Sequence, residues 1–412
     1  FLTRSINQMS ATLTTVAGIL KEVYEGDVRD QVAGSEVTIK RVTKSSEGIF
    51  DTPGGKYVVF PVRKNRNHGI SYRAENAQLA AARRQGYAQA TEQLKYGYGR
   101  IRLTGQLIEL AKTNAQAFMN AAEGEIDGIK DDLIRDSNRI AVGHRASFAA
   151  HGYTGVITEV TATTASTTIN VSSTQNIEVD MVLDIVDDTG VAVSGGSGVV
   201  VTAVTSDTAF TVSGSVAGTT NGNNIVRTGN WNNEPYGLNH LLSASGTIHG
   251  INSATAGNEY WRSTVDSTTT TLTEAPMISM CDTIRRKSGK HITAIFMSLG
   301  VRRSYFNLMT SLRRYNEVKE WTGGLVGLAF NYEKEVPVVT DIDLQASQAL
   351  FVNEKEISVY RNREWYWADD DGSMLKYVHD YDAWEALMKQ YWQVVVHQRN
   401  CHGVMTTVTE AS

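Results

Sequence analysis

A long polar segment enclosed by two strand-like runs constrains the fold of this chain more than any other feature of its sequence. Lys56–Val62 (KYVVFPV) has the pattern of a strand and follows a turn at Pro53-Gly54-Gly55. Leu94–Thr104 (LKYGYGRIRLT) is its expected return strand, in which alternate side chains share a face. That face carries Tyr96, Tyr98, Arg100 and Arg102. Because a polar loop of this length is uncommon in a compact domain, the sequence predicts an extended hairpin over residues 47–104.

Most of the charged residues in this hairpin are basic. Nine Lys or Arg residues and two Glu residues lie between positions 63 and 102, inside a chain of 412 residues with a net charge of −5. Such a segment suits an acidic partner surface or the phosphates of a nucleic acid, and the plain alternative is a solvated loop. The negative charge of the whole chain, in contrast, argues against a globally basic nucleic-acid binder.

Residues 114–142 have the clearest helical periodicity in the chain. Asn114 suits the N-cap, and the apolar face holds Phe118, Ala122, Ile126, Ile129, Leu133 and Ile140. The opposite face is acidic and includes Asp127, Asp131, Asp132 and Asp136. Paired carboxylates can act as catalytic acids and bases, but no nucleophile, histidine or phosphate loop accompanies these. A solvated face or a contact with a basic partner is therefore the favoured interpretation.

A single apolar stripe runs through the first 25 residues. Its members recur at steps of four and three residues: Leu2, Ile6, Met9, Leu13, Val16, Leu20 and Val23. This spacing is typical of a heptad seam or of an amphipathic helix. The stripe packs either on its own domain or on the surface of a partner.

The composition changes abruptly at about Tyr153. From Thr154 to Asn230 the chain has one basic residue, Arg227, and seven acidic residues. Five strand-like runs alternate with turn clusters, at 167–171, 181–186, 199–204, 209–212 and 225–227. Short strands at this spacing predict a small all-β barrel or sandwich. We interpret residues 153–230 as an autonomous inserted β-domain.

Mixed α/β patterning resumes after Trp231. Helices are expected at 275–288, ended by Gly289, and at 301–321. Strands are expected at 291–297, 336–340, 350–353, 357–360, 390–399 and 404–408, with a helical turn at 383–389. The run Asp369-Asp370-Asp371-Gly372 lacks the spaced ligands of a calcium loop. It is expected to be a hairpin turn between 364–368 and 375–379.

Motifs for catalysis, cofactors and metals are missing from the sequence. It contains no phosphate-binding loop, dinucleotide fingerprint or nucleophile elbow, and its nine histidines show no zinc-binding spacing. Cys281 and Cys401 form no disulfide framework or zinc motif. No apolar run approaches the roughly 18 residues of a membrane helix. The sequence predicts a non-enzymatic protein with no cofactor, no metal site and no membrane segment.

The order of these parts resembles that of the major capsid protein of tailed bacteriophages of the Hong Kong 97 type. GGKYVVFPV, then the polar arm, then QATEQLKYGYGRIRLTGQLIELAKTNAQAF look like an extended E-loop that leads into the spine helix of a peripheral domain. EWYWADDDGSMLKYVHDYDAWEALMKQYWQVVVHQRNCHGVM is similar to the ending of many such shell proteins. The resemblance covers nearly the whole chain except residues 154–230.

The resemblance implies an α+β fold of the Hong Kong 97 type with an inserted small all-β domain. Its parts are the N-terminal arm 1–46, the E-loop hairpin 47–104, the spine helix of the peripheral domain 105–152, the inserted β-domain 153–230, the axial domain 231–368 and C-terminal strands 369–412 that return to the peripheral domain. It also implies self-assembly as hexamers and pentamers into the icosahedral shell of a virion, in the cytoplasm of a bacterial host, around double-stranded DNA. Portal, scaffolding and decoration proteins are the other partners that it implies.

In this family the E-loop lies across an adjacent subunit. We therefore expect contacts between E-loop arginines and acids of a neighbour's spine helix. The arginines are Arg66, Arg73, Arg83 and Arg84, and the acids are Asp127, Asp131 and Asp132. The competing interpretation is that the arm faces DNA. The N-terminal stripe is expected to be buried in the assembled shell.

Two other classes of protein stay open at this point. One is an encapsulin-like compartment shell protein, which has the same fold and encloses an enzyme. The other is a carbohydrate-binding or adhesive β-protein, in which residues 154–230 are the working module.

Overall fold

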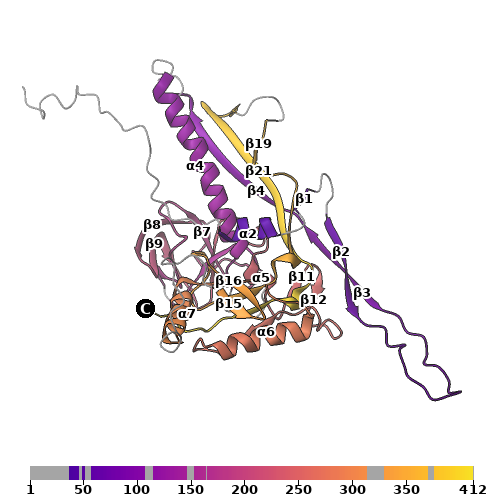
Figure 1. The fold of residues 1–412 in the computed structure, drawn as a ribbon. Helices are drawn as coiled ribbons and strands as arrows, with labels where there is room; N and C mark the ends of the chain where they lie inside the picture. Colours follow the sequence, from indigo (N-terminus) through magenta and orange to yellow (C-terminus); the bar gives the residue numbers. More distant parts are fainter. Residues whose placement is uncertain are drawn as a thin grey trace, which may run out of the picture. The chain divides into compact units, whose positions relative to one another are not determined.

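The chain divides into two units, Phe1–Ala33 and Gly34–Ser412. The computed structural model describes residues 37–45, 49–51, 57–106, 115–145, 153–163, 165–312, 329–369 and 375–411, all of which belong to the second unit. Figure 1 labels most of its elements. The helices are α2 (Val37–Ser45), α4 (Ala115–Val142), α5 (Leu238–Leu241), α6 (Glu274–Ser288) and α7 (Leu299–Leu312), with the 3-10 helices η2 (Glu354–Glu356) and η3 (Arg399–Cys401).

The described strands form three six-stranded sheets and two hairpins. The first sheet holds β1 (Ile49–Asp51), β4 (Lys95–Thr104), β18 (Ile357–Arg361), β19 (Tyr366–Trp367), β20 (Lys376–Tyr377) and β21 (Ala383–Val396). The second holds β5 (Val156–Glu159), β6 (Ser166–Asn170), β7 (Val182–Val186), β8 (Val199–Ser206), β9 (Ala209–Val216) and β10 (Asn224–Arg227). The third holds β13 (Thr264–Asp266), β14 (Ala294–Met297), β15 (Ala329–Tyr332), β16 (Lys334–Thr340), β17 (Ala349–Val352) and β22 (Gly403–Met405). The hairpins are β2 (Tyr57–Asn65) with β3 (Gly86–Gln93) and β11 (Thr247–Ile248) with β12 (Ile251–Asn252).

Strand β21 organises the first sheet. Strand β4 pairs with it over ten residues, from Ala383↔Thr104 to Trp392↔Lys95. Strands β18, β19 and β20 also pair with β21, each at a different stretch of its length. Figure 1 shows α4 beside β4 and β21. This sheet therefore joins the segment before α4 to the end of the chain.

Three of the expectations for this region were wrong. Leu94–Thr104 is not the return strand of the hairpin, because β2 pairs with β3 and β4 pairs with β21. Residues 383–389 are not a helical turn but the first half of β21, which pairs with β4 and in which Ala383, Ala386 and Met388 are buried. Strands β19 and β20 do not pair with each other across residues 369–372, since both pair with β21.

Two glycines let α4 and Trp365 lie close to β4. Gly97 and Gly99 alternate with the exposed Tyr96 and Tyr98, so the glycines are on the side of the strand that faces the helix. A Cβ added at Gly99 would lie 2.6 Å from Leu133 Cδ1, and one at Gly97 would lie 2.8 Å from Trp365 Cη2. The two glycines of the YGYG pattern therefore allow α4 and Trp365 to pack closely against β4.

The variant Gly99→Val is expected to lower the free energy of unfolding by about 1–3 kcal/mol, because its side chain overlaps Leu133 in a packed interface. Gly214→Val is the matched control, since Gly214 lies in β9 with open space around its Cα. The control should change stability little, because a β-branched residue suits an open strand position. Thermal denaturation followed by circular dichroism measures both. Equal losses for the two variants would contradict the close-contact explanation.

The third sheet separates two hydrophobic cores. Ile295 and Met297 of β14 face the core that contains the buried residues of α6 and α7. Ala294 and Phe296, on the opposite side of the same strand, face the core shared with α5, β18 and β21. Helix α6 ends at Gly289, which has φ +74° and whose amide donates to Arg285 O, as expected from the sequence. Alternate side chains of β14 thus pack in the two cores on opposite sides of the sheet.

Residues 156–227 form the second sheet around a core of their own. The strand order is β5-β10-β7-β8-β9-β6, and a bridge between Val160 and Val171 joins the two outer strands. Ile169, Leu183, Ile185, Phe210 and Ile225 are fully buried in this barrel. The five expected strands are present and β5 is an additional one. That this barrel is an autonomous insertion stays a prediction.

Candidate intersubunit surfaces

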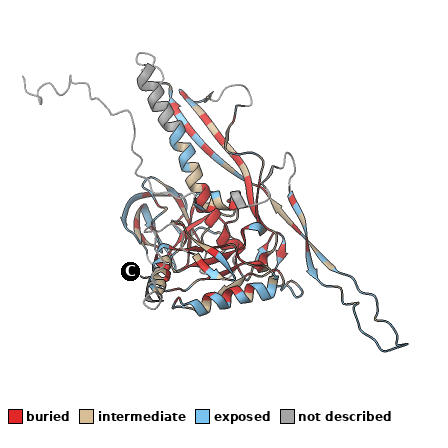
Figure 2. Cartoon of the chain, viewed as in Figure 1, coloured by how far each residue is buried: buried red, intermediate tan, exposed pale blue. Residues whose placement is uncertain are grey.

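The β2–β3 hairpin exposes a long tip. Its two strands pair only with each other among the described strands, and β3 supplies the return that the sequence analysis assigned to 94–104. Tyr72, Ile70 and Leu79 are 99%, 81% and 82% exposed. Figure 2 shows most of the connection between β2 and β3 as exposed. The tip of the hairpin is therefore a basic and partly apolar surface that no other described residue covers.

The four arginines expected to make contacts all lie on this tip. Arg66, Arg73, Arg83 and Arg84 are exposed. Arg73 Nε donates to Ser71 Oγ at 3.4 Å, and within the described residues no ion pair joins any of the four to a carboxylate. Arg100, Arg102 and Lys95 belong instead to β4, where both arginines lie near Glu385. The hairpin itself is therefore less basic than residues 63–102 as a whole.

The root of the hairpin is anchored in the core by His249. Thr91 N donates to His249 O at 3.0 Å, and Val396 N donates to His249 Nε2 at 3.1 Å. Because Nε2 accepts, Nδ1 carries the hydrogen and donates to Glu92 Oε2 at 3.0 Å. Burial lowers the pKa of His249, which keeps the ring neutral. His249 (φ +51°) and Gly250 (φ +75°) form the tight turn between β11 and β12. Exposed tip and fixed root therefore belong to one element.

The acidic face of α4 is only partly available. Asp127, Asp131 and Asp132 are exposed, which a contact surface requires. Asp132 also lies 3.8 Å from Arg135 NH1, one turn along the same helix. Asp136, by contrast, faces inward and takes part in a buried ion-pair network.

That network joins α4 to the β-barrel. Arg139 Nε lies 2.8 Å from Asp136 Oδ1, and Arg139 NH2 lies 2.8 Å from Glu234 Oε1. Arg227 NH1 lies 3.1 Å from Asp136 Oδ2. Burial by itself raises the pKa of Asp136, but the charges of Arg139 and Arg227 outweigh it and lower this pKa. The one basic residue of 154–230 is thus used to hold the barrel against the helix.

A second polar cluster fixes α2 on α4. Thr38 Oγ1 donates to Asp341 Oδ2 at 2.6 Å, and Ile39 N donates to Asn138 Oδ1 at 3.0 Å. Asn138 Nδ2 donates to Asp341 Oδ2 at 3.1 Å and to Asp343 Oδ2 at 2.7 Å. Burial raises the pKa of Asp343 to about 6, and the neighbouring Asp341 adds to this effect. Nothing in the sequence pattern singles out these carboxylates.

The variant Asp343→Asn is expected to stabilise the protein at pH 7 and to lose that advantage at pH 4. The pKa of the carboxyl is raised on folding, so the cost of ionising it grows between about pH 4 and about pH 6 and is complete above that. A rise of the pKa from 3.8 to about 6, reduced for partial exposure, corresponds to about 1–2 kcal/mol. Urea unfolding at both pH values measures the difference, with the exposed Asp207→Asn as control. A gain that is the same at pH 4 and pH 7 would rule out this explanation.

The apolar stripe of the N-terminal segment, Leu2 to Val23, lies outside the described residues. Within the described ranges no cluster of His, Cys, Asp and Glu is arranged to hold a metal ion. No helix in the described part of the chain is long and apolar enough to cross a membrane.

The fold of these elements is similar to the folds of chains in three solved capsid structures. The chain is similar to the subunit in the cyanophage A-1(L) capsid, with a TM-score of 0.61 and 13% identity, over 97% of this chain and 100% of that one. It is also similar to the capsid of a native GTA particle, with a TM-score of 0.53 and 9% identity, over 97% and 100% of the two chains. A third similar structure is the capsid of an empty GTA particle, with a TM-score of 0.51 and 8% identity, over 97% of this chain and 99% of that one. No protein-family model and no curated protein matches the sequence.

Proposed function

We propose that this chain is the major capsid protein of a tailed bacteriophage of the Hong Kong 97 type. It is a structural, non-catalytic subunit that assembles as hexamers and pentamers into an icosahedral shell around double-stranded DNA in a bacterial host. The observation that carries the proposal is the likeness to capsid subunits over nearly the full length of both chains. Portal, scaffolding and decoration proteins are the partners that such a shell uses.

The exposed hairpin supports assembly. A two-stranded hairpin is marginally stable alone, and this one carries large apolar side chains in solvent at Ile70, Tyr72 and Leu79. Lying on a second subunit removes that apolar surface from water. Folding of the tip and assembly of the shell are then linked, because a partner that binds the folded form stabilises it.

Electron microscopy of the purified full chain tests this function. Closed shells of uniform size are the expected result, and a monomer that never assembles would contradict it. An enzyme cargo inside the shells in place of DNA would indicate an encapsulin-like compartment. The adhesive alternative has little support, because Phe210 is the only aromatic residue of 154–230 and it is fully buried, which leaves no ring to stack on a sugar.

We further propose that hairpin arginines contact acids on the α4 helix of a neighbouring subunit. The double variant Arg83→Glu with Arg84→Glu is expected to impair shell assembly, and adding Asp131→Arg with Asp132→Arg should partly restore it. Each exposed pair contributes only about 0.2–1 kcal/mol, but every subunit repeats the contact. The yield of shells on a sucrose gradient measures the effect, which should weaken as salt rises.

The control for this charge exchange is Arg363→Glu, an exposed arginine outside the hairpin. It should leave the yield of shells unchanged. If the hairpin double variant forms normal empty shells and reduces only the DNA retained inside them, the arm contacts phosphate and the proposed contact with α4 is wrong.

A further inference from the structure

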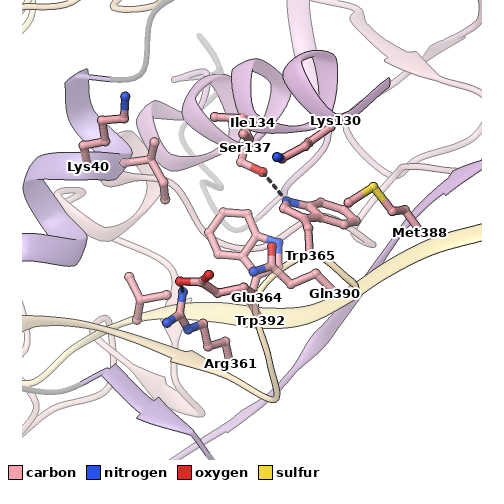
Figure 3. Close-up of a pocket in the computed structure, with 12 residues that line it drawn as sticks. Lys40, Lys130, Ile134, Ser137, Arg361, Glu364, Trp365, Met388, Gln390 and Trp392 are labelled. Atoms are coloured by element: carbon pink, nitrogen blue, oxygen red, sulfur yellow. Dashed lines mark hydrogen bonds and ion pairs between the residues drawn. The ribbon is translucent and has the colours of Figure 1, made fainter. Parts of the chain in front are cut away.

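A cavity of about 550 Å³ opens between α2, α4 and the first sheet. Its walls come from elements far apart in the sequence: Ile39 on α2, Ile134 on α4, and Met388 and Trp392 on β21. Trp365, in the segment before β19, forms a further wall, and Figure 3 shows its ring next to Lys130 and Met388. This volume is within the range of sites that bind small molecules or the anchoring side chains of a peptide.

The walls of the cavity are held in place by packing and hydrogen bonds. Trp365 Nε1 donates to Ser137 Oγ at 3.3 Å, and Ser137 Oγ donates to Leu133 O at 2.7 Å. The Trp365 ring also lies against Gly97, where a side chain would displace it. On the other wall, the Asp341 cluster described above fixes α2. The site is therefore formed before any ligand binds, which reduces the entropy lost on binding.

Three of the four charged side chains that line the cavity are basic. Lys40, Lys130 and Arg361 line it together with a single carboxylate, Glu364. Lys40 and Lys130 are exposed, and Arg361 NH1 lies 3.0 Å from Glu364 Oε1. An apolar floor with cationic side chains around it suits a ligand that has large apolar groups next to negative charge. A DNA duplex does not suit the apolar floor, because its stacked, paired bases present no free apolar group that could fill the space.

We infer that this cavity is a docking site for an acidic peptide segment of a second protein that acts during assembly. Two or three large apolar side chains of the peptide fill the space between Trp365, Trp392 and Ile134. Its carboxylates lie near Lys40 and Lys130. The inference rests on the proposed function only for the step at which the partner acts, because peptide binding can be measured on the unassembled chain.

The test uses the full chain and two fluorescein-labelled peptides, DELFDLIED and KKLFKLIKK, in fluorescence anisotropy titrations. The acidic peptide is expected to bind and the basic peptide to bind at least about tenfold more weakly. Ile134→Asp should weaken binding of the acidic peptide at least about tenfold, because it places a charge in the apolar floor. Ile129→Asp is the matched control on another side of α4, and it should leave binding unchanged.

A variant that keeps the fold intact at the cavity provides a second measurement. Lys130→Glu changes an exposed side chain, so it should fold normally, weaken binding several-fold and reduce its dependence on salt. Equal binding of both peptides, or no loss with either Ile134→Asp or Lys130→Glu, would overturn the inference. Binding of a labelled 20-base-pair duplex that depends on Lys130 and competes with the peptide would also overturn it. Electron microscopy of the same preparations reports shell formation separately, so failure of the docking site and failure of the capsid function give different results.

Discussion

Replacing Arg139 with methionine is expected to lower the free energy of unfolding by about 3–5 kcal/mol, because the buried Glu234 then loses its cation and Asp136 keeps only Arg227. Arg139 is 8% exposed and lies between Asp136 of its own helix and Glu234. Burial alone would lower the pKa of Arg139, but the two carboxylates outweigh it and raise this pKa, so the guanidinium stays charged. Chemical denaturation of the unassembled chain measures the loss.

The pH dependence of this effect has a definite sign. The pKa of Asp136 is lowered in the folded protein, so the network contributes stability above the ordinary pKa of about 3.9 and loses it as pH falls through the lowered value. The difference between the native protein and Arg139→Met should therefore be constant near pH 7 and shrink below about pH 4. A difference that grows in acid would contradict this assignment.

Arg135→Met is the matched control for Arg139→Met. Arg135 lies one turn away on the same helix, and its partner Asp132 is 68% exposed. A surface pair of this kind contributes about 0–1 kcal/mol. If both variants lose the same stability, the effect belongs to helix charge and not to the buried network.

Replacing Arg399 with methionine is expected to cost about 3–5 kcal/mol, because at least three backbone carbonyls then lose a buried donor. The side chain is fully buried. It donates to Leu241 O and Trp261 O at 3.0 Å each, and to Ser245 O at 2.9 Å. Burial lowers the pKa of Arg399 to about 9, which still leaves the group charged at pH 7. Its three carbonyl partners lie at the end of α5 and in the segment between α5 and β13, so the side chain connects several points of that segment.

Two variants define the role of this guanidinium. Arg399→Lys should recover part of the loss, since an ammonium group donates three hydrogen bonds but cannot match the planar fork of arginine. Arg262→Met is the control, because Arg262 also donates to a carbonyl, Ser253 O at 2.9 Å, but is only half-buried. It should cost about 1 kcal/mol. Loss of stability of the same size in both variants, measured by thermal denaturation, would show that burial is not the cause.

The errors made for the hairpin have a common physical reason. Gly86–Gln93 (GYAQATEQ) has small and polar residues that favour a loop, yet Ala88 and Ala90 pack in the core as part of β3. Leu94–Thr104 was correctly predicted to be a strand with Tyr96, Tyr98, Arg100 and Arg102 on its exposed face. Its partner β21 comes about 280 to 300 residues later in the chain, since the pairing runs from Ala383↔Thr104 to Trp392↔Lys95. Alternation identifies a strand but does not say which strand it pairs with.

The candidate surfaces differ in how far the sequence anticipated them. The exposure of Arg66, Arg73, Arg83 and Arg84, and of Asp127, Asp131 and Asp132, follows from local charge and periodicity. The inward position of Asp136 does not, because its partner Arg227 comes from β10 of the barrel and reaches it only when the barrel packs on α4. The isolated Arg227 in an otherwise acidic segment was the one signal of that contact.

Local sequence patterns predict the kinds of element and their order: a strand-flanked basic arm, a long helix with an acidic face, a run of short strands, and a mixed α/β segment. These follow from patterns within a few residues, which depend on backbone geometry and on the separation of apolar from polar side chains. The pairing of β4 with β21, the cavity between Trp365 and α2, and the buried networks around Arg139 and Arg399 become visible only in the folded chain. Each depends on contacts between residues far apart in the chain, whose free energy is gained only once the intervening segments have folded.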